Sequence, residues 1–286
     1  MSAGPEQIDV RHLGRERVIC CLRQDDVIVD PGPEVSLDAV VEALSDSTPR
    51  AILLTHIHLD HAGGVGALVR RWPGVEVWVH ERGAPHLVDP SRLIASATRL
   101  YGEEMASLWG EIVPVPQANL RVLRGGEVIG AWRVAYTPGH AQHHVAYLHE
   151  PTGTAFCGDV AGVRIADGPV LAPTPPPDID LEAWERSIGL IERWAPVRLA
   201  LTHFGVHEGV GEHLATLRER LALAGERSRS LDARAFEAEL LAWLGERVDR
   251  ELLAAYVQAM PPDALHAGLA LYWRRRAQAD GASGGR

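Results

Sequence analysis

Apolar and polar positions follow two different periods along the first two-thirds of the chain. Short runs that are mainly apolar or that alternate with polar residues predict strands, and apolar residues three and four apart predict helices. We expect strands over residues 17–22, 26–29, 50–54, 75–79, 120–123, 127–136, 144–149, 154–156 and 197–201. We expect helices over residues 36–44, 62–72, 90–109 (one helix or two) and 181–194. This alternation is typical of an α/β fold.

Two stretches depart from this pattern. Residues 168–177 contain five prolines and predict an extended loop. After about Glu208 the strand pattern ends, and Ala, Leu, Glu and Arg recur with helical spacing, which predicts three or four helices forming a cap or small subdomain. We therefore divide the chain into an α/β domain over residues 1–207, a helical subdomain over 208–280 and a disordered end over 281–286.

Two of the predicted helices begin after a side chain that caps helices well. Ser36 and Asp180 stand at the starts of the helices expected over residues 36–44 and 181–194. Their side-chain oxygens can accept a hydrogen bond from a free backbone N–H of the first turn.

Composition narrows the classes of function. The chain has 286 residues, of which 46% are hydrophobic and 23% charged, as in ordinary globular proteins. Its net charge of -10 repels phosphate backbones, so nucleic acid is not an expected partner. A small anionic substrate stays open, because bound metal cations would reverse the field locally. All 28 basic residues are Arg, which excludes a Schiff-base lysine and a Walker-type phosphate loop.

Cysteine content and the N-terminal residues bear on location. Only Cys20, Cys21 and Cys157 occur, a low and odd count that favours a reducing compartment. The N-terminal residues have neither the basic nor the apolar region of a signal peptide, and no apolar run approaches the roughly 20 residues that span a bilayer. We expect a cytoplasmic protein without a membrane partner.

One short run carries the densest chemistry of the chain. The strand expected over residues 50–54 leads into Thr-His-Ile-His-Leu-Asp-His at residues 55–61, followed by Ala-Gly-Gly. Side chains two apart at a strand end point the same way, so His56 and His58 can face one metal ion. The chain then turns, and Asp60 and His61 face a neighbouring point. Imidazole with some carboxylate is what zinc and similar metals favour, so the run predicts a metal site.

Three further ligand-type side chains stand just after predicted strands. They are His140 in Thr-Pro-Gly-His, Asp159 in Cys-Gly-Asp and His203 in Thr-His-Phe-Gly. Sites in layered α/β folds gather at strand ends, so these side chains are candidates for the same metal centre.

The His-x-His-x-Asp-His run with the later His, Asp and His resembles the metallo-β-lactamase superfamily over about residues 10–207. The resemblance implies a four-layer αββα sandwich with metals at one edge of its two sheets, here followed by a helical cap. Its motif assigns ligands to two ions and a bridge: His56, His58 and His140 to the first ion, Asp60, His61 and His203 to the second, and Asp159 between them.

This ligand set is similar to that of the glyoxalase II and thioesterase-like branch. A Cys commonly takes part in the second site of the antibiotic-hydrolysing branch, but here Asp159 holds that position and Cys157 stands two residues earlier, which counts against β-lactamase activity. The intact second site counts against the mononuclear-iron sulfur dioxygenases. The resemblance therefore implies two divalent ions, Zn first with Fe or Mn as alternatives, and a bridging hydroxide that hydrolyses a glutathione or CoA thioester. Asp60 would also orient that nucleophile or carry its proton.

Several neighbouring residues are expected around the centre rather than in it. Asp30 and His144 are predicted to support the ligands, whereas His143 is expected on the other face of a strand. His80 and His86 are expected to be ordinary surface or core residues.

The sequence leaves some alternatives open. The same metal pair could serve a small-molecule phosphodiesterase, or the chain could be a regulatory or binding protein that keeps the metals and acts through its helical tail. A small-molecule substrate is the expected partner, and a homodimer is possible.

Overall fold

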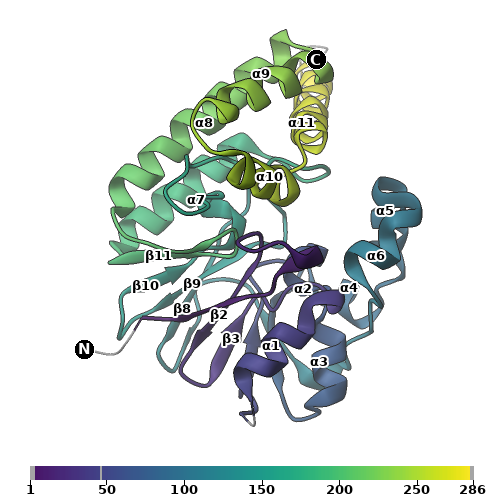
Figure 1. Ribbon diagram of the computed structural model, residues 1–286, viewed down its shortest axis with the longest axis vertical. Helices are drawn as coiled ribbons and strands as arrows, with labels where there is room; N and C mark the ends of the chain where they lie inside the picture. The colour runs from purple at the N-terminus through teal and green to yellow at the C-terminus, as the bar shows by residue number, and fades with distance from the viewer. Residues whose placement is uncertain (1–3, 46, 284–286) are drawn as a thin grey trace.

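The computed structural model describes residues 4–45 and 47–283, and over these residues it contains two six-stranded sheets stacked face to face (Figure 1). The first sheet contains, in spatial order, β1 (Glu6–Asp9), β2 (Cys20–Gln24), β3 (Val27–Val29), β4 (Ala51–Leu53), β5 (Glu76–His80) and β6 (Leu120–Leu123). The second contains β12 (Gly205–His207), β11 (Arg198–Leu201), β10 (Thr154–Phe156), β9 (Val145–His149), β8 (Trp132–Tyr136) and β7 (Val128–Ile129).

Both sheets are mixed. Strands β3 to β6 pair in parallel, whereas β1, β2 and β3 pair antiparallel. In the second sheet β10 and β11 are parallel and the remaining pairs are antiparallel. The parallel strands place their carboxyl ends at one edge, where the loops after β3 and β4 meet those of the other sheet.

The alternation along each strand divides the core in two. Leu53 and Trp78 face the second sheet and pack there with Tyr147 and Phe156. Ile52, the neighbour of Leu53, faces the other way, into the core beneath the outer helices. Because successive side chains of a strand point to opposite faces, a strand buried on both sides must be apolar throughout, as β4 is.

Helices cover both outer faces and complete the four-layer αββα sandwich. The helices outside the sheets before β6 are α1 (Leu37–Leu44), α2 (Leu59–Ala62), α3 (Val65–Arg71), α4 (Ala84–Val88), α5 (Ser91–Tyr101) and α6 (Met105–Trp109). The second sheet is followed by α7 (Leu181–Trp194), α8 (Val210–Ser230), α9 (Ala233–Gly245), α10 (Arg250–Ala259) and α11 (Pro262–Ser283). Figure 1 shows α1 and α3 beside the first sheet, α7 against the second, and α8 to α11 above them. The predicted fold with a helical cap is confirmed.

Short 3-10 turns join several of these elements. They are η1 (His12–Gly14), η2 (Glu34–Ser36), η3 (Gly102–Glu104), η4 (Gln117–Asn119) and η5 (Gly158–Ala161). Of these, η5 carries Asp159 and therefore belongs to the candidate site.

Most predicted elements form, and the differences are local. Helix α7 has the predicted bounds, and Asp180 caps it by accepting a hydrogen bond from the Ala183 N–H at 2.8 Å. The prediction that Ser36 caps α1 through its side chain is wrong, because its hydroxyl lies 3.2 Å from His12 Nδ1 instead. The strand expected over residues 127–136 is two strands, β7 and β8, separated by a turn at Gly130.

The helix expected to start at Ala62 begins earlier. The structure has α2 from Leu59 and a separate α3 from Val65, so the two glycines lie between helices rather than between a strand and a helix. Strands β1 and β12 and helix α4 were not predicted, because each is only three to five residues long and carries too little periodicity.

The tail begins soon after the predicted boundary at residue 207, which is the last residue of β12. Of the end expected to be disordered, residues 281–283 belong to α11, and residues 284–286 lie outside the described residues. Among the helices that the structure describes, none combines the length and apolar character needed to cross a lipid bilayer.

Candidate metal centre

The side chains predicted to bind metal lie at the ends of four strands, where the two sheets meet. The run His56, His58, Asp60 and His61 follows β4 of the first sheet. From the second sheet, His140 follows β8, Asp159 follows β10 and His203 follows β11. The structure brings all seven together in three overlapping groups that could each hold an ion: His56 with His58 and His140, His56 with His61 and Asp159, and Asp60 with His61 and His203.

Three imidazole nitrogens converge in the first group. His58 Nδ1 lies 2.9 Å from His56 Nε2 and 3.0 Å from His140 Nε2. Ligand atoms about 2.0–2.1 Å from one tetrahedral zinc ion lie roughly 3.3 Å apart, close to these separations. We call His56, His58 and His140 the three-histidine cluster.

The second group combines imidazoles with a carboxylate. Asp60 Oδ2 lies 3.2 Å from His203 Nε2 and 3.8 Å from His61 Nε2. We call Asp60, His61 and His203 the mixed cluster. Its donor set is one that zinc, iron and manganese accept.

Asp159 stands between the two clusters, with one carboxylate oxygen toward each. Its Oδ2 lies 3.3 Å from His140 Nε2 in the three-histidine cluster. Its Oδ1 lies 3.3 Å from His61 Nε2 and 3.8 Å from His203 Nε2 in the mixed cluster. Asp159 is only 4% exposed, so bulk water does not solvate its charge.

Two buried polar atoms at this junction, His61 Nε2 and Asp159 Oδ1, make no hydrogen bond among the described residues, although they face each other at 3.3 Å. Buried polar groups are almost always satisfied, so these atoms indicate a group that the protein chain does not itself supply. A divalent cation would bind both. The residues present therefore fit a pair of metal ions.

Hydrogen bonds on the far side of the imidazole rings fix their orientation. The Nδ1 atoms of His140 and His203 donate to the carbonyl oxygens of Pro173 at 2.9 Å and of Val18 at 2.6 Å. His61 Nδ1 donates to Asp30 Oδ2 at 2.8 Å. A ring whose Nδ1 carries the proton presents a free lone pair on Nε2, which is the atom that faces the clusters.

Asp30 holds several parts of the site at once. Besides His61, its Oδ2 accepts hydrogen bonds from the hydroxyls of Thr55 at 2.6 Å and Thr202 at 2.7 Å, and its Oδ1 accepts from the Thr55 N–H at 2.8 Å. Thr55 and Thr202 each precede a candidate ligand. The repeated Thr-His pair was the available sequence signal for these two threonines, which sequence reasoning missed.

His144 lies behind the three-histidine cluster. Its ring stacks on that of His56 with centroids 5.1 Å apart, and its Nδ1 lies 2.8 Å from Thr137 Oγ1. Gly158 is needed here, because a Cβ on it would lie 2.3 Å from Thr55 Oγ1 and 3.1 Å from His144 Nε2. The prediction for His143 is wrong: it lies in the turn before β9, and its Nδ1 accepts a hydrogen bond from the Ile57 N–H at 3.3 Å.

Burial makes the three-histidine cluster a set of neutral donors. It lowers the pKa of His56 well below its ordinary value and that of His58 to about 3, and the neighbouring imidazoles add to both effects. Burial also lowers the pKa of His140, although the charge of Asp159 partly offsets the effect. Neutral imidazole is the form that binds a metal ion.

The mixed cluster has the opposite electrostatics. Burial alone would lower the pKa of His61 and His203, but the nearby carboxylates of Asp159 and Asp60 raise both. Burial likewise would raise the pKa of Asp159 and Asp60, but the facing imidazoles lower them. The raised pKa values favour protonated His61 and His203, whose positive charge offsets that of the Asp60 and Asp159 carboxylates. A divalent cation at this position would offset the same negative charge.

The centre is accessible from one side. His58 and Asp60 are partly exposed, while the other five candidate ligands are buried. Leu59, which lies between these two residues, packs with Trp109, and Tyr101 packs against the same apolar cluster. The Trp109 ring also stacks on buried His12 with centroids 5.5 Å apart. An apolar, aromatic wall from α5 and α6 thus adjoins the exposed side of the centre.

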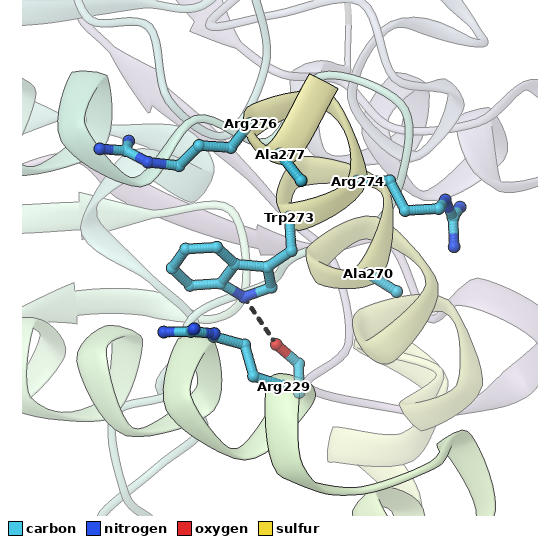
Figure 2. Close-up of a pocket in the computed structure, with 7 residues that line it drawn as sticks. Arg229, Ala270, Trp273, Arg274, Arg276 and Ala277 are labelled. Atoms are coloured by element: carbon cyan, nitrogen blue, oxygen red, sulfur yellow. Dashed lines mark hydrogen bonds between the residues drawn. The ribbon is translucent and has the colours of Figure 1, made fainter. Parts of the chain in front are cut away.

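A separate surface cavity of about 580 Å³ lies in the helical tail, and Figure 2 shows the side chains around it. Arg229, Trp273, Arg274 and Arg276 are among the lining residues, and none of the seven candidate ligands is. The Arg229 guanidinium lies 4.8 Å from the centre of the Trp273 ring, and Arg276 pairs with Glu182. The cavity is therefore distinct from the metal centre.

Comparison with curated proteins finds relatives over part of the chain. A hydroxyacylglutathione hydrolase of Legionella pneumophila (strain Lens) is 30% identical over 148 residues, which are 50% of this chain and 46% of that protein. The chain thus spans about half the length of the curated relatives that it matches.

Solved structures extend the likeness in fold. An archaeal metallo-beta-lactamase superfamily protein, ST1585 from Sulfolobus tokodaii, is 25% identical with a TM-score of 0.64, over 75% of this chain and 86% of that one. The protein TTHA1623, solved in a di-iron-bound form, is 27% identical with a TM-score of 0.52, over 67% of this chain and 87% of that one. The family model of the Metallo-beta-lactamase superfamily matches residues 19–203, which include every candidate ligand. The chain therefore belongs to the metallo-β-lactamase superfamily.

Proposed function

We propose that the protein is a dinuclear metal-dependent hydrolase that cleaves a thioester of a small thiol, such as glutathione or coenzyme A. The observation that carries the proposal is the position of Asp159, whose two carboxylate oxygens each lie 3.3 Å from an imidazole of a different cluster. A carboxylate placed in this way suits two adjacent cations better than one. The family membership and the hydroxyacylglutathione hydrolase relatives support the same class of reaction.

The residues divide into two proposed ion sites. The three-histidine cluster would hold one ion, the mixed cluster the other, and Asp159 would bridge them. Zinc suits these donors, and the di-iron form of TTHA1623 supports iron as an alternative, with manganese also compatible. When bound, two such ions supply Lewis acidity and make water acidic enough to act as a nucleophile near neutral pH.

The chain's own groups would place substrate and water. The partly exposed His58 and Asp60 mark the side from which a thioester carbonyl can approach. Asp60 would orient the attacking water and accept its proton, while the buried members keep their rings fixed through the hydrogen bonds at Nδ1. In the reaction, water adds its oxygen to the acyl carbon, the carbon–sulfur bond breaks, and the thiol leaves with a proton.

The apolar wall beside the centre would receive the acyl group. Tyr101 and Trp109 lie with ring centroids 5.2 Å apart, and Leu59 connects them to the metal-binding run. Burial raises the pKa of Tyr101 to about 12, and the charges of Asp60 and Asp263 add to the effect. Tyr101 is therefore a neutral side chain of this wall, and we expect it to contact an apolar acyl group.

The test begins with metal content and turnover of the full chain. We expect about two metal ions per chain and hydrolysis of hydroxyacyl-glutathione or acyl-CoA thioesters, followed as thiol release. A bis-aryl phosphodiester serves as the competing substrate. Phosphodiester turnover without thioester turnover would replace our proposal by a phosphodiesterase, and two bound ions without any turnover would favour a binding protein.

Two variants and a control assign the activity to the centre. Asp159→Asn keeps the size of the side chain but removes its charge, and we expect fewer than two ions and a large loss of turnover. Asp60→Asn should lower kcat by about a hundredfold where metal is still bound, as expected for loss of a proton acceptor. His86→Ala alters a histidine outside both clusters and should behave as the unchanged protein. Full turnover of Asp60→Asn at full metal occupancy would remove Asp60 from the chemistry.

A further inference from the structure

Residues 162–177, which form most of the loop between η5 and α7, carry a group that orients the three-histidine cluster. The Pro173 carbonyl accepts the hydrogen bond from His140 Nδ1 at 2.9 Å. Pro173 and its neighbours over residues 170–174 are buried. Because the ring of His140 is tied to this carbonyl, a displacement of the loop would displace Nε2 from the cluster.

The C-terminal helices hold this loop through side chains that do not touch the metal centre. The hydroxyl of Tyr256 in α10 donates to the Pro169 carbonyl at 2.7 Å and accepts from the Ile165 N–H at 3.0 Å. Tyr256 is fully buried. One hydroxyl thus holds the backbone at both Ile165 and Pro169. Each hydrogen bond gives a partner to a backbone group of the loop.

The next contact lies one residue from Pro173. Thr174 Oγ1 donates to the Leu265 carbonyl of α11 at 3.0 Å, and Thr174 is only 1% exposed. The Arg275 guanidinium donates to the Pro177 carbonyl at 2.7 Å farther along the loop. Helix α11 therefore binds the loop on the side of Pro173 that leads to α7.

The backbone of α11 also lies directly against the loop at Gly268. A Cβ at this position would lie 2.1 Å from the Thr174 carbonyl oxygen and 2.7 Å from the Pro175 carbonyl carbon. Only a hydrogen atom fits in that space, and the atoms that a Cβ would meet belong to the backbone rather than to a flexible side chain. A methyl group at Gly268 must therefore push α11 and the loop apart.

We propose that α10 and α11 act as a clamp that sets the position of His140 through the loop 162–177. Tyr256, Thr174 and Gly268 are its positioning residues, since each acts through the loop rather than on substrate or metal. This role goes beyond shaping a substrate pocket. It depends on His140 as a metal ligand and is independent of which ester the centre hydrolyses.

The test measures metal affinity rather than turnover. Metal-free full chain is titrated with Zn²⁺ by calorimetry, and circular dichroism checks that each variant is folded. We expect Gly268→Ala to weaken the binding of one of the two ions by about tenfold, the low end of what losing an outer-shell partner of a ligand costs. Gly211→Ala in α8 is the matched control, because a Cβ there meets nothing within 4 Å. Its affinities should equal those of the unchanged protein.

A second pair of variants keeps the proposal testable if Gly268→Ala does not fold. Thr174→Val removes the hydroxyl at nearly constant volume and should weaken the same ion, whereas Thr174→Ser should restore its affinity. In a His140→Ala background, Thr174→Val should have no further effect. The clamp is refuted if Thr174→Val binds both ions normally, if Thr174→Ser fails to restore affinity, or if the loss persists without His140.

Discussion

Replacing Asp30 by Asn tests how far the centre depends on one buried carboxylate. In Asp30→Asn, the oxygen that faces the Thr55 N–H can be kept, which places the new NH2 group where Oδ2 accepted three hydrogen bonds. The hydroxyls of Thr55 and Thr202 can rotate to accept from that NH2. The Nδ1–H of His61 cannot, so a donor is left facing a donor.

The size of the effect follows from this count. A hydrogen bond to a charged group contributes about 1.5–3 kcal/mol, and the lost bond to His61 is of that kind. The two facing N–H groups also repel each other, so we expect the free energy of unfolding to fall by about 3 kcal/mol. At roughly 2–4 °C per kcal/mol for a chain of this size, the Tm falls by about 6–12 °C. If His61 moves its proton to Nε2 instead, the mixed cluster loses a ligand, and affinity for its ion falls by about 10–100-fold.

Thermal unfolding by circular dichroism and a Zn²⁺ titration measure the two effects. Asp26→Asn is the control, because Asp26 is an exposed carboxylate that pairs with Arg50 Nε at 2.8 Å. Such surface pairs contribute about 0–1 kcal/mol, so this variant should unfold as the unchanged protein does. If Asp30→Asn binds both ions normally and unfolds within 1–2 °C of the unchanged protein, on the scale of the control, the account of Asp30 is wrong.

Three further predictions concern metal binding and substrate choice. Because carboxylates raise the pKa of His61 and His203, uptake of the second ion should release protons. Its affinity should fall as the pH is lowered from 8 to 6, by up to about tenfold per proton for each pH unit. Calorimetry in buffers of different ionisation enthalpy measures the proton release, and uptake without it would contradict the prediction. Chelation should lower the Tm, because an ion at about 100 times its Kd contributes about 2.7 kcal/mol; identical melting curves with and without chelator would argue against bound metal. Tyr101→Ala should lower kcat/KM for bulky apolar acyl thioesters by about tenfold and leave acetyl thioesters unchanged; equal losses on both would mean that Tyr101 does not select the acyl group.

The run of candidate ligands could be recognised in the sequence because it is local. Three histidines and an aspartate within six residues, after an apolar strand, leave little freedom in where their side chains point. The later candidates, His140, Asp159 and His203, could be placed because each directly follows a strand, and strand ends meet at one edge.

The supporting groups could not be read in the same way. The carbonyls of Val18 and Pro173 accept hydrogen bonds from the rings of the candidate ligands His203 and His140, and a backbone acceptor cannot be recognised from the residue type. The contact between Gly268 and Thr174 joins residues far apart in the chain, and it arises only when the tail packs on the loop. Tertiary packing of this kind leaves no periodic pattern in the sequence.

The positions of the candidate ligands along the chain also determine when, during synthesis, each cluster can be completed. Each cluster takes candidate ligands from the segment after β4 of the N-terminal sheet and from loops of the C-terminal sheet, of which His203 comes last. A nascent chain that has completed only its first sheet contains four of the seven candidate ligands, namely His56, His58, Asp60 and His61. Filling of both proposed ion sites must therefore wait until nearly the whole α/β domain has left the ribosome. The binding of both proposed ions would then follow synthesis of the α/β domain, and excess metal at an earlier stage would not bring it forward.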